Sequence, residues 1–391
     1  MSSNGNAADF VVIGAGVMGT SIAFHLARRK AGRIILLDKD HVGRGASGRS
    51  SALIRMHYTF PPEVQLALKS LEMFRNWAEI TGAPGDFRRT GFVQLVPEKD
   101  IGSLKANVEM QRRLGVNVEI LNPDELHKIE PDWYLDDVVA AAYEPDSGYG
   151  DGAGVANDFL AAARELGVEY RPRTGVTDFV LEGDRITGVA TDHAEISAPV
   201  VIAACGQWSK GLFTRAHIDI PIQTEYHEVA ILKNPVGMKP GGCACIDYTL
   251  SVYFRSEGHD KTLVGAFTGE GDVDAENFPQ KASQESLAGL AEMACRRIPR
   301  LENAELIRGI TGVYDLTADS RALLGEVPEV GGLYIAAGFS GMGFKISPAI
   351  GLVMSEVVLE GRSKTVDISA FRLSRFAEGQ PIRPEFEYAE R

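Results

Sequence analysis

The stretch Phe10-Val-Val-Ile-Gly-Ala-Gly-Val-Met-Gly19 decides the fold of this chain of 391 residues. Its first four residues are an uninterrupted apolar run that ends in glycine, which is typical of a parallel strand buried on both faces. Apolar residues then recur near helical spacing from position 17 to position 27, and Ile34-Ile-Leu-Leu37 is a second buried run. The sequence therefore predicts a strand, a helix and a second parallel strand in succession, and with them an α/β fold.

Gly14, Gly16 and Gly19 form the GxGxxG pattern between this strand and this helix, which is the context that dinucleotide binding needs. The first glycine permits a tight turn, the second lets the backbone approach a pyrophosphate, and the third allows close packing of helix on strand. Asp38 follows the second strand and would accept hydrogen bonds from a ribose diol. An acidic residue there favours FAD or NAD over NADP. A tight turn without a ligand is the alternative.

The composition narrows the classes of partner. The chain has 53 acidic and 40 basic side chains, a formal net charge of −13, and 45% hydrophobic residues. The hydrophobic content is enough for one or two buried cores and excludes a disordered chain. Because a strongly negative protein repels nucleic acid and anionic lipid, we expect no nucleic-acid partner.

The four cysteines indicate neither a disulfide framework nor a metal site, and the N-terminal stretch does not indicate a membrane span. The cysteines, at 205, 243, 245 and 295, are too few for a disulfide scaffold and lack the CxxC spacing of a zinc site. We expect no metal, and we expect Cys243-Ala-Cys245 to lie in a loop. Residues 1–9 are polar, and no apolar run is long enough to cross a bilayer. We therefore expect no membrane span and a cytoplasmic location.

After residue 37, segments of buried strands and amphipathic helices alternate with segments of strands that have polar alternation. Buried runs and amphipathic helices of the α/β type include a helix from Pro61 to Gly82, a stripe from 155 to 166, and the buried strands at 200–206 and 333–337, the last followed by a long helix. A hairpin is expected at Gly183-Asp184. A mixed insertion spans about 84 to 145, strands with polar alternation dominate from about 222 to 268, and a charged helix covers about 281 to 297. The chain is thus expected to visit two domains alternately.

Three further stretches reveal a family resemblance. They are Gly43-Arg-Gly-Ala-Ser-Gly-Arg-Ser-Ser-Ala-Leu-Ile-Arg55, Val201-Ile-Ala-Ala-Cys-Gly-Gln-Trp-Ser209 and Ala336-Ala-Gly-Phe-Ser-Gly-Met-Gly-Phe-Lys345 with Ile346-Ser-Pro after it. With these motifs in this order, the chain resembles the D-amino-acid oxidase (DAO) superfamily of flavoproteins, and in particular its sarcosine oxidase-like amine oxidoreductases, over essentially its whole length.

The resemblance implies a fold and a division of the chain. It implies a Rossmann-type FAD-binding domain with a second, substrate domain built on a mixed, largely antiparallel sheet. The predicted FAD-binding domain is discontinuous and comprises residues 1–83, 146–221 and 305–391. The predicted substrate-binding domain comprises residues 84–145 and 222–304.

The resemblance also implies a set of FAD-binding positions, most of them small residues that let the chain pass close to the cofactor. Gly338, Gly341 and Gly343 leave the backbone bare before a helix, so that its N-terminal amides and dipole can face the flavin edge; a plain loop is the alternative. The expected cofactor-binding residues are Gly14, Gly16, Val17, Met18, Gly19, Asp38, Lys39, Ala46, Ser47, Ser50, Ser51, Val176, Ala204, Gly206, Trp208, Gly338, Gly341, Met342, Gly343, Phe344 and Lys345.

Two departures from the family concern the flavin. The Cys that carries covalent FAD in monomeric sarcosine oxidases aligns near Gly312, and the His that carries it in related dehydrogenases aligns near Ala46-Ser47. Neither residue is present, so we expect non-covalent FAD. The Lys that promotes reaction with oxygen aligns near Leu263, with only Lys261 close by. Its loss should slow the use of O2.

The substrate side of the resemblance falls on three residues. The Arg and the Lys that hold a substrate carboxylate correspond to Arg55 and Lys345, and Tyr253 corresponds to an aromatic hydroxyl over the substrate pocket, with a register uncertain by one residue. A buried cation is costly unless it meets an anion, which favours a substrate with a carboxylate. A structural salt bridge for each cation and a core position for the tyrosine are the alternatives. His57 and His227 are further polar candidates, each with a plain surface or core alternative.

The implied reaction is oxidation of a secondary amine or amino acid, such as sarcosine, another N-methyl amino acid or proline. Hydride would pass from the carbon next to a neutral amine to the flavin, the imine would hydrolyse, and O2 would be reduced to H2O2. One alternative is a dehydrogenase or complex subunit that passes electrons to another carrier. The others are an NAD-dependent dehydrogenase and a flavin-binding module without catalysis. The sequence leaves a homo-oligomer or membership of a complex open.

Overall fold

The computed structural model describes residues 5–238, 242–267 and 269–388. It confirms the first predicted unit: β1 (Phe10–Ile13), α1 (Val17–Arg28) and β2 (Ile34–Leu37), with β1 and β2 parallel. This unit belongs to a six-stranded sheet in which only the outer pair β20–β21 is antiparallel among the described strands. The order of the sheet is β20 (Leu323–Glu326), β21 (Leu333–Ala337), β13 (Val200–Ala203), β1, β2 and β9 (Glu169–Arg171).

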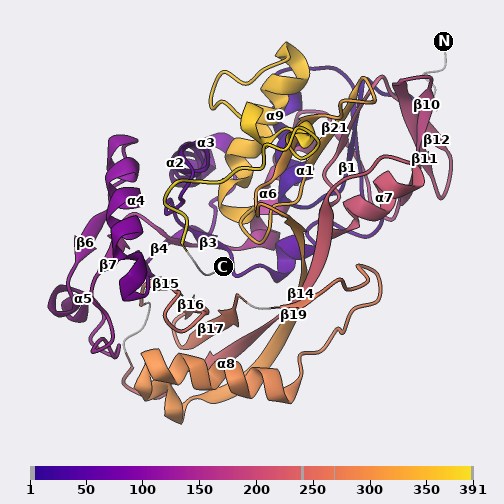
Figure 1. Cartoon of the computed structure of the whole chain (residues 1–391). Helices are drawn as coiled ribbons and strands as arrows, with labels where there is room; N and C mark the ends of the chain where they lie inside the picture. The colour runs from indigo at the N-terminus through magenta and orange to yellow at the C-terminus, as the bar shows by residue number, and fades with distance from the viewer. Residues whose placement is uncertain (1–4, 239–241, 268, 389–391) are drawn as a thin grey trace.

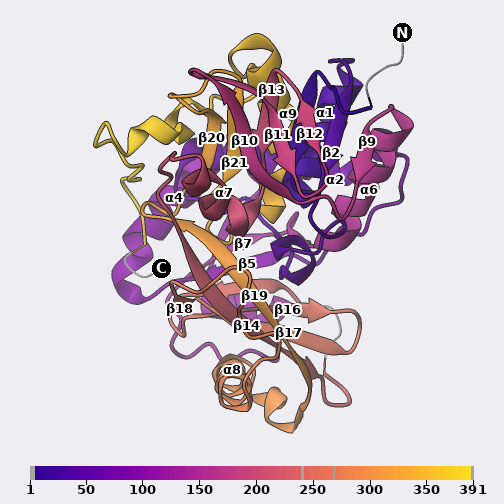
Figure 2. The same ribbon diagram turned by 90° about the vertical axis from the view of Figure 1, so that its right-hand side faces the viewer.

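This sheet is the middle of three layers, as Figures 1 and 2 show. Successive strand residues point to opposite faces, so Phe10 and Val12 pack among the helices α1, α6 (Gly152–Glu165) and α9 (Ser347–Glu360). Val11 and Ile13 pack on the other side against a three-stranded sheet of β10 (Val176–Glu182), β11 (Arg185–Thr191) and β12 (Glu195–Ser197). Burial on both faces explains the uninterrupted apolar run. The predicted hairpin between β10 and β11 is confirmed.

A nine-stranded sheet forms the second half of the molecule. The pairing of β15 with β5 is parallel, and the other pairings between its described strands are antiparallel. This confirms the predicted mixed, largely antiparallel sheet. The order is β18 (Glu270–Gly271), β14 (Ile222–Lys233), β17 (Lys261–Ala266), β16 (Val252–Glu257), β15 (Ala244–Asp247), β5 (Phe92–Leu95), β7 (Ala141–Glu144) and β6 (Glu119–Leu121), with β19 (Glu305–Thr317) paired to β14.

The two faces of the nine-stranded sheet have different neighbours. Helix α8 (Gln284–Arg297) covers one face, where Phe254 and Cys245 pack among its leucines. The opposite face carries Tyr253 and Leu263, which belong to the core shared with the six-stranded half. Figure 1 shows α8 on the side of this sheet that is remote from the other half. Along β16, Tyr253 therefore faces the six-stranded half and Phe254 faces α8.

The remaining elements lie between or beside the two large sheets. A small sheet joins β3 (Leu53–Ile54), β8 (Gly148–Tyr149) and β4 (Arg88–Arg89). The other α-helices are α2 (Pro61–Arg75), α3 (Trp77–Thr81), α4 (Ile101–Arg113), α5 (Pro123–Ile129) and α7 (Ser209–Arg215). Short 3-10 turns at Ala46–Arg49, Gly206–Trp208 and Phe344–Ile346 face the site described below.

Two expectations differ from the structure. Cys243-Ala-Cys245 is not a loop, because Cys243 is buried beside β15 and Cys245 pairs with Phe254 within that sheet. A thiol is small and apolar enough for such a buried strand. The segment 305–317, which the resemblance assigns to the FAD-binding domain, hydrogen-bonds along β14 in the nine-stranded sheet. The predicted division into two domains otherwise stays a prediction.

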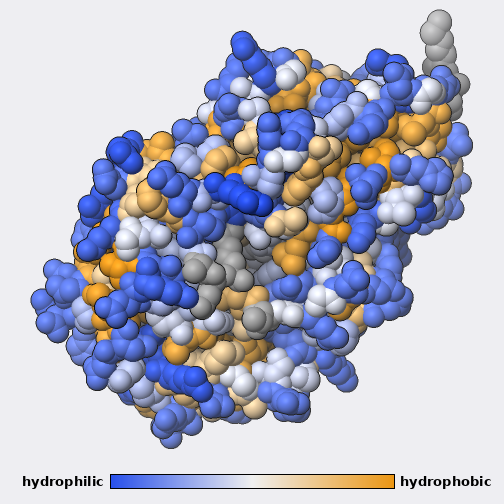
Figure 3. Space-filling model, in the orientation of Figure 1, coloured by the Kyte–Doolittle hydropathy of each residue, from blue (hydrophilic) through white to orange (hydrophobic). Residues whose placement is uncertain are grey.

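The described residues give three further facts. Their four cysteines are free thiols, and within 5–238, 242–267 and 269–388 no cluster of His, Cys, Asp and Glu is arranged to hold a metal. No helix in the described part of the chain is long and apolar enough to span a bilayer. On the face drawn in Figure 3, hydrophilic side chains separate smaller hydrophobic areas. Residues 1–4 of the polar N-terminal stretch, and 239–241 and 268 in the predicted strand region, lie outside the described residues.

Candidate functional site

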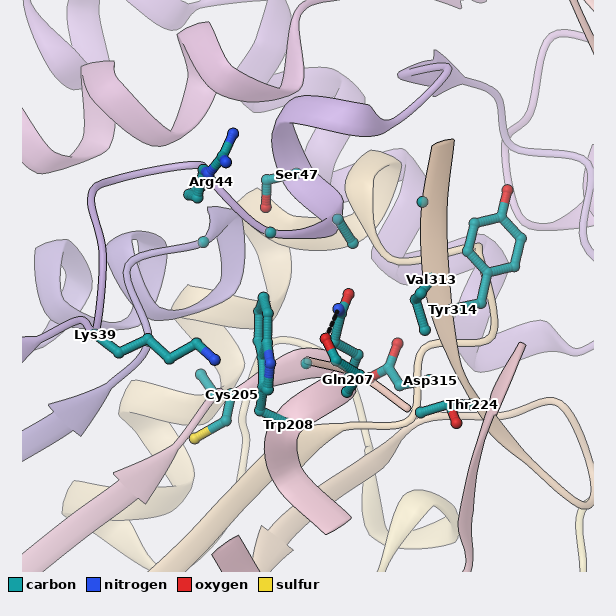
Figure 4. A pocket seen from close by; sticks show the side chains of 18 of the residues that line it. Lys39, Arg44, Ser47, Cys205, Gln207, Trp208, Thr224, Val313, Tyr314 and Asp315 are labelled. Atoms are coloured by element: carbon teal, nitrogen blue, oxygen red, sulfur yellow. Dashed lines mark hydrogen bonds between the residues drawn. The ribbon is translucent and has the colours of Figure 1, made fainter. Parts of the chain in front are cut away.

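A cavity of about 1000 Å³ opens where the parallel strands of the six-stranded sheet end. Gly14 and Gly16 follow β1, Asp38 follows β2, and Ala204 follows β13, so all four meet at one edge of that sheet. Ligands in open α/β folds bind at this carboxyl edge. Figure 4 shows Lys39, Cys205 and Trp208 toward one end of the cavity and Val313, Tyr314 and Asp315 toward the other.

The glycine turn has no room for side chains. A Cβ on Gly14 would lie 2.4 Å from the carbonyl oxygen of Ala204, and Gly14 has a φ of +100°. A Cβ on Gly19 would lie 1.8 Å from the carbonyl oxygen of Gly14, which is why α1 can pack directly on the end of β1. A Cβ on Gly16 would lie 3.0 Å from Ser47 Oγ. The turn is therefore a bare backbone cradle at a helix N-terminus, which fits a pyrophosphate.

Asp38 is held in place at the same edge. Its Oδ2 accepts a hydrogen bond of 2.7 Å from the backbone N–H of Ala15, and its Oδ1 accepts one of 2.8 Å from Asp40. Burial raises the pKa of this carboxyl, and the two backbone hydrogen bonds oppose that rise. Each carboxylate oxygen has a further lone pair. Asp38 lines the cavity and can accept hydroxyl hydrogen bonds from a ribose.

Two residues beside Asp38 complete this end of the cavity. The ammonium group of Lys39 lies 4.1 Å from the centre of a ring of Trp208, a cation–π contact. Cys205 also lines the cavity, but burial raises the pKa of its thiol to about 12. Cys205 therefore stays protonated at neutral pH and is a poor nucleophile.

Small residues from two distant parts of the chain also line the cavity. Ser47 Oγ accepts a hydrogen bond of 3.0 Å from the N–H of Val17, which ties the 3-10 turn at Ala46–Arg49 to the start of α1. A Cβ on Gly341 would lie 2.6 Å from the ring of Tyr314, and one on Gly343 would lie 2.9 Å from Met18 Cε. The backbone is bare at both glycines, and both line the cavity.

Most of the expected cofactor-binding residues line this one cavity. They are Gly14, Gly16, Val17, Met18, Asp38, Lys39, Ala46, Ser47, Ser50, Val176, Ala204, Gly206, Trp208, Gly341, Gly343 and Phe344. Together, the cradle, the ribose acceptor and the long cavity fit an FAD molecule.

Five expected cofactor-binding residues do not line the cavity, and their contacts explain why. Gly19 is covered by the turn at Gly14, as described above. The N–H of Gly338 donates to Asp315 Oδ2 at 2.6 Å, and the carbonyl of Met342 accepts from the hydroxyl of Tyr58. The carbonyl of Ser51 accepts from the Arg255 guanidinium. The fifth residue, Lys345, points toward a different group of side chains.

Arg55 and Lys345 come together beside the ring of Tyr58. The guanidinium carbon of Arg55 lies 4.8 Å from the centre of that ring, and the ammonium nitrogen of Lys345 lies 5.9 Å from it. Both side chains are buried, at 6% and 5% exposure. Arg55 donates to the carbonyl of His57, while its Nε has no hydrogen-bond partner among the described residues. The structure thus gathers two predicted cations at one buried place.

A row of aromatic rings leads from the cavity toward these cations. Tyr314 lines the cavity, and its side chain is hydrogen-bonded to that of Tyr253. Tyr253 lies 5.9 Å from Phe267 and Phe267 lies 5.1 Å from Tyr248, measured between ring centres. Burial raises the pKa of Tyr253 well above its ordinary value, so its hydroxyl stays protonated.

The two histidines lie at different ends of this row. His227 stacks on Tyr314 with ring centres 4.0 Å apart, and its Nε2 lies 2.7 Å from a carboxylate oxygen of Glu225. Burial lowers the pKa of His227, against the opposing effect of Glu225. His57 is buried beside Arg55, and burial together with the charge of Arg55 lowers its pKa to about 3. His57 is therefore neutral at physiological pH.

The segment 272–280, between β18 and α8, forms one wall of the cavity. No sequence pattern predicts this position for it. Gln207 Nε2 donates to the carbonyl of Ala275 at 3.1 Å, and Arg49 donates to Gln280 at 3.0 Å. Lys39 also pairs with Glu276. These single polar contacts carry no periodicity that a sequence pattern could reveal. Residues 313–315 of β19 also line the cavity, and no sequence pattern predicts that they do. Gly312 beside them is named in the sequence analysis only because the FAD-linking cysteine of related enzymes aligns near it.

Comparisons with known proteins agree with this geometry. A family model described as FAD dependent oxidoreductase (DAO) matches residues 9–357. The chain is 30% identical over 429 residues to FAD-dependent oxidoreductase domain-containing protein 1 of Mus musculus, covering 96% of this chain and 86% of that protein. It is similar to the crystal structure of L-proline dehydrogenase from P. horikoshii, with a TM-score of 0.90, 27% identity and coverage of 96% of this chain and 100% of that one. For glycine oxidase from Geobacillus kaustophilus the TM-score is 0.83, with 25% identity and coverage of 95% and 99%.

Proposed function

The chain belongs to the DAO family of FAD-dependent oxidoreductases, and from this premise we propose that it oxidises a small amine or amino acid that carries a carboxylate. The candidate substrates are sarcosine, another N-methyl amino acid, and proline. Relatives named glycine oxidase and L-proline dehydrogenase support this class of substrate.

The observation that carries the proposal is the pairing of Arg55 and Lys345 on the ring of Tyr58. Two cations in a buried place repel each other and lose hydration, and an anion offsets both costs. A carboxylate also suits a guanidinium, which can donate two parallel hydrogen bonds to it. The Arg55 Nε, without a hydrogen-bond partner among the described residues, is one donor left for such a ligand.

The proposed chemistry needs a neutral amine beside the flavin. Bound FAD supplies the acceptor for a hydride that leaves the carbon next to that amine. The buried rings of Tyr253 and Tyr248, with the partly buried ring of Phe267 between them, exclude water. Removal of water disfavours the charged form of an amine. A carboxylate held by Arg55 and Lys345 would fix the position of that carbon. The imine product is then hydrolysed by water.

The electron acceptor divides the proposal into two candidates. In the first, O2 is reduced to H2O2. The second is a dehydrogenase or complex subunit with another acceptor. It is supported by Leu263, because the resemblance places the oxygen-activating lysine of related oxidases near this position. Leu263 is buried on the face that carries Tyr253, whereas Lys261 is paired with Asp260 at 3.3 Å near the surface. Without a cation there, superoxide formation is less stabilised.

We propose that FAD is held without a covalent bond. Gly312 lines the cavity, and the resemblance places the FAD-linking cysteine of related enzymes near this glycine. A Cβ at Gly312 would lie 3.6 Å from the Arg49 side chain. Cys205 lines the cavity beside Asp38 and Lys39, on the side expected for the adenosine half of FAD. We also propose that the expected cofactor-binding residues bind FAD and that the expected substrate-side residues bind the substrate. A cytoplasmic location is likewise a proposal.

The test is an anaerobic screen of the purified holoenzyme. Sarcosine, other N-methyl amino acids, L-proline, glycine and D-amino acids are mixed with it in turn, and loss of the flavin absorbance is followed. We expect at least one secondary amine with a carboxylate to bleach the flavin, and its decarboxylated counterpart to do so far more slowly. A flavin that no amine in the panel reduces would contradict the proposal and favour a flavin-binding module without catalysis. Peroxide formation in air then separates the oxidase from the dehydrogenase.

A further inference from the structure

The C-terminal tail, residues 380–388, runs from the six-stranded half back to the middle of the molecule, as Figure 1 shows. Three contacts fix its path. Glu387 pairs with Arg321 at 2.7 Å and accepts a hydrogen bond of 3.0 Å from the hydroxyl of Thr59. The carbonyl of Phe386 accepts a hydrogen bond of 2.8 Å from the side chain of Asn107 in α4. The tail is therefore attached to both halves of the chain.

These contacts place Tyr388 in the interior. Its side chain is 5% exposed, and its hydroxyl lies 2.7 Å from Nε2 of His57. The two rings are nearly parallel, with an interplanar angle of 6° and centres 6.0 Å apart. Because His57 is neutral, the hydroxyl of Tyr388 can donate to its Nε2. A tail residue is thus held by a specific contact to His57, which lies two residues after Arg55 in the sequence.

Tyr388 also completes the row of rings described above. Its ring centre lies 5.5 Å from that of Tyr248, which is the end of the row that begins at Tyr314 and Tyr253. On its other side, His57 lies 6.5 Å from Phe92, and the guanidinium of Arg55 lies 5.6 Å from the centre of the Phe92 ring. The row therefore passes from the cofactor cavity through Tyr388 to the cation that the proposed function assigns to the carboxylate.

We propose that the C-terminal tail forms the outer wall of the substrate chamber and that Tyr388 limits the size of the group that fits beside Arg55. This inference rests on the proposed carboxylate site at Arg55 and Lys345. A ring held by both stacking and a hydrogen bond cannot turn aside without losing both contacts, so it excludes larger ligands sterically. Its removal leaves an opening toward the tail side of the chamber.

The test uses the purified holoenzyme and three carboxylates of increasing size: acetate, benzoate and 2-naphthoate. Each is titrated against the oxidised enzyme, and the change in the visible flavin spectrum gives its Kd. Tyr388→Ala should lower the ratio of the 2-naphthoate Kd to the acetate Kd by about tenfold or more, the effect of relieving one steric contact in a pocket. Tyr388→Phe keeps the ring and should keep the ratio. Phe386→Ala, an exposed side chain on the same tail, is the matched control and should also keep it.

The outcomes separate this inference from the proposed function. An unchanged ratio in Tyr388→Ala, with acetate still binding, would overturn the role of the tail and leave the carboxylate site intact. Failure of wild type and variants to bind any of the three carboxylates would instead contradict the carboxylate site, and this inference with it. If Tyr388→Ala does not retain flavin, Tyr388→Leu provides the same measurement with an apolar side chain that still fills part of the space. It should shift the ratio in the same direction, and no shift would overturn the proposal.

Discussion

Glu144 Oε2 accepts a hydrogen bond of 2.9 Å from the backbone N–H of Met56, the residue directly after Arg55. The same oxygen accepts a hydrogen bond from the hydroxyl of Ser147, while Oε1 has no partner among the described residues. Burial raises the pKa of Glu144 from 4.5 to about 7, against the opposing effects of these hydrogen bonds and of the charge of Arg55. A fully buried carboxyl that titrates near neutrality therefore lies behind the proposed carboxylate site.

We predict that carboxylate binding weakens as the pH rises through about 7. Below that pH Glu144 is protonated, and Arg55 attracts the ligand without competition. Above it, the ionised Glu144 both neutralises Arg55 and repels the ligand, so the Kd should rise by at most about tenfold per pH unit. Titrations of benzoate between about pH 6 and about pH 9 measure this. Glu144→Gln should flatten the profile, whereas Glu109→Gln at an exposed position of α4 should not. A wild-type Kd that is independent of pH would contradict the prediction.

Arg55→Met and Lys345→Met should each weaken substrate binding far more than flavin binding. Loss of one charged hydrogen bond costs about 1.5–3 kcal/mol, which corresponds to a rise of roughly 10- to 150-fold in KM. Lys261→Met removes an exposed cation paired with Asp260 and is the control. Steady-state kinetics and the flavin content of each purified variant give the two quantities. Michaelis constants that stay at the wild-type value in both variants would mean that the anion site is elsewhere.

Gly14→Ala should destroy cofactor binding, because its Cβ would meet the Ala204 carbonyl at 2.4 Å and the backbone has a φ of +100°. Gly102→Ala is the matched control: Gly102 lies in α4, where a Cβ would meet only open space, and an alanine in a helix is favoured over glycine by about 1 kcal/mol. The absorbance ratio of flavin to protein and the thermal unfolding temperature distinguish the two. Normal flavin content in Gly14→Ala would contradict the role of this glycine turn in binding the cofactor.

Acid precipitation should release the yellow cofactor into the supernatant. The prediction follows from Gly312 at the position where a covalent linkage would need a cysteine, and from the protonated thiol of Cys205. The supernatant is compared with authentic FAD by its absorbance and by chromatography. A yellow pellet after washing would show a covalent bond.

Leu263→Lys should increase the rate at which O2 reoxidises the reduced enzyme, because it places a cation on the inner face of the sheet near Tyr253. A gain of at least about tenfold is expected from electrostatic stabilisation of superoxide, at the expense of some stability, since Leu263 is buried. Stopped-flow reoxidation of the photoreduced enzyme measures the rate. The conservative Leu263→Met separates packing effects from charge. Equal rates in wild type and Leu263→Lys would exclude this explanation of slow oxygen use.

The first βαβ unit could be predicted because burial on both faces and the lack of side chains at the glycine turn leave a direct trace in the sequence. Val11 and Val12 face different layers, yet both must be apolar, which distinguishes a central strand from an edge strand. The face of Tyr253 could not be fixed in the same way. Both Tyr253 and Phe254 are aromatic and both are buried, so alternation alone does not say which one faces the site.

Contacts between residues far apart in the sequence could not be predicted in this way. The pairing of β19 with β14 depends on which strands meet in space, and the residues of β19 are compatible with either half. The tail contacts of Glu387 and Tyr388 and the cavity contacts of Ala275 are individual hydrogen bonds or ring contacts, made at positions without a repeating pattern. Only a family resemblance points to Arg55 and Lys345, because nothing in their own surroundings in the sequence predicts that they meet.

The segment 272–280 belongs to the nine-stranded half, yet it forms part of the wall around the cofactor cavity. A dinucleotide bound there would contact the strand ends of one half and the segment 272–280 of the other. Ligands that bind only the folded state stabilise it. Loss of the cofactor would therefore remove contacts between the two halves and lower the stability of the folded chain, while the core that they share would still join them.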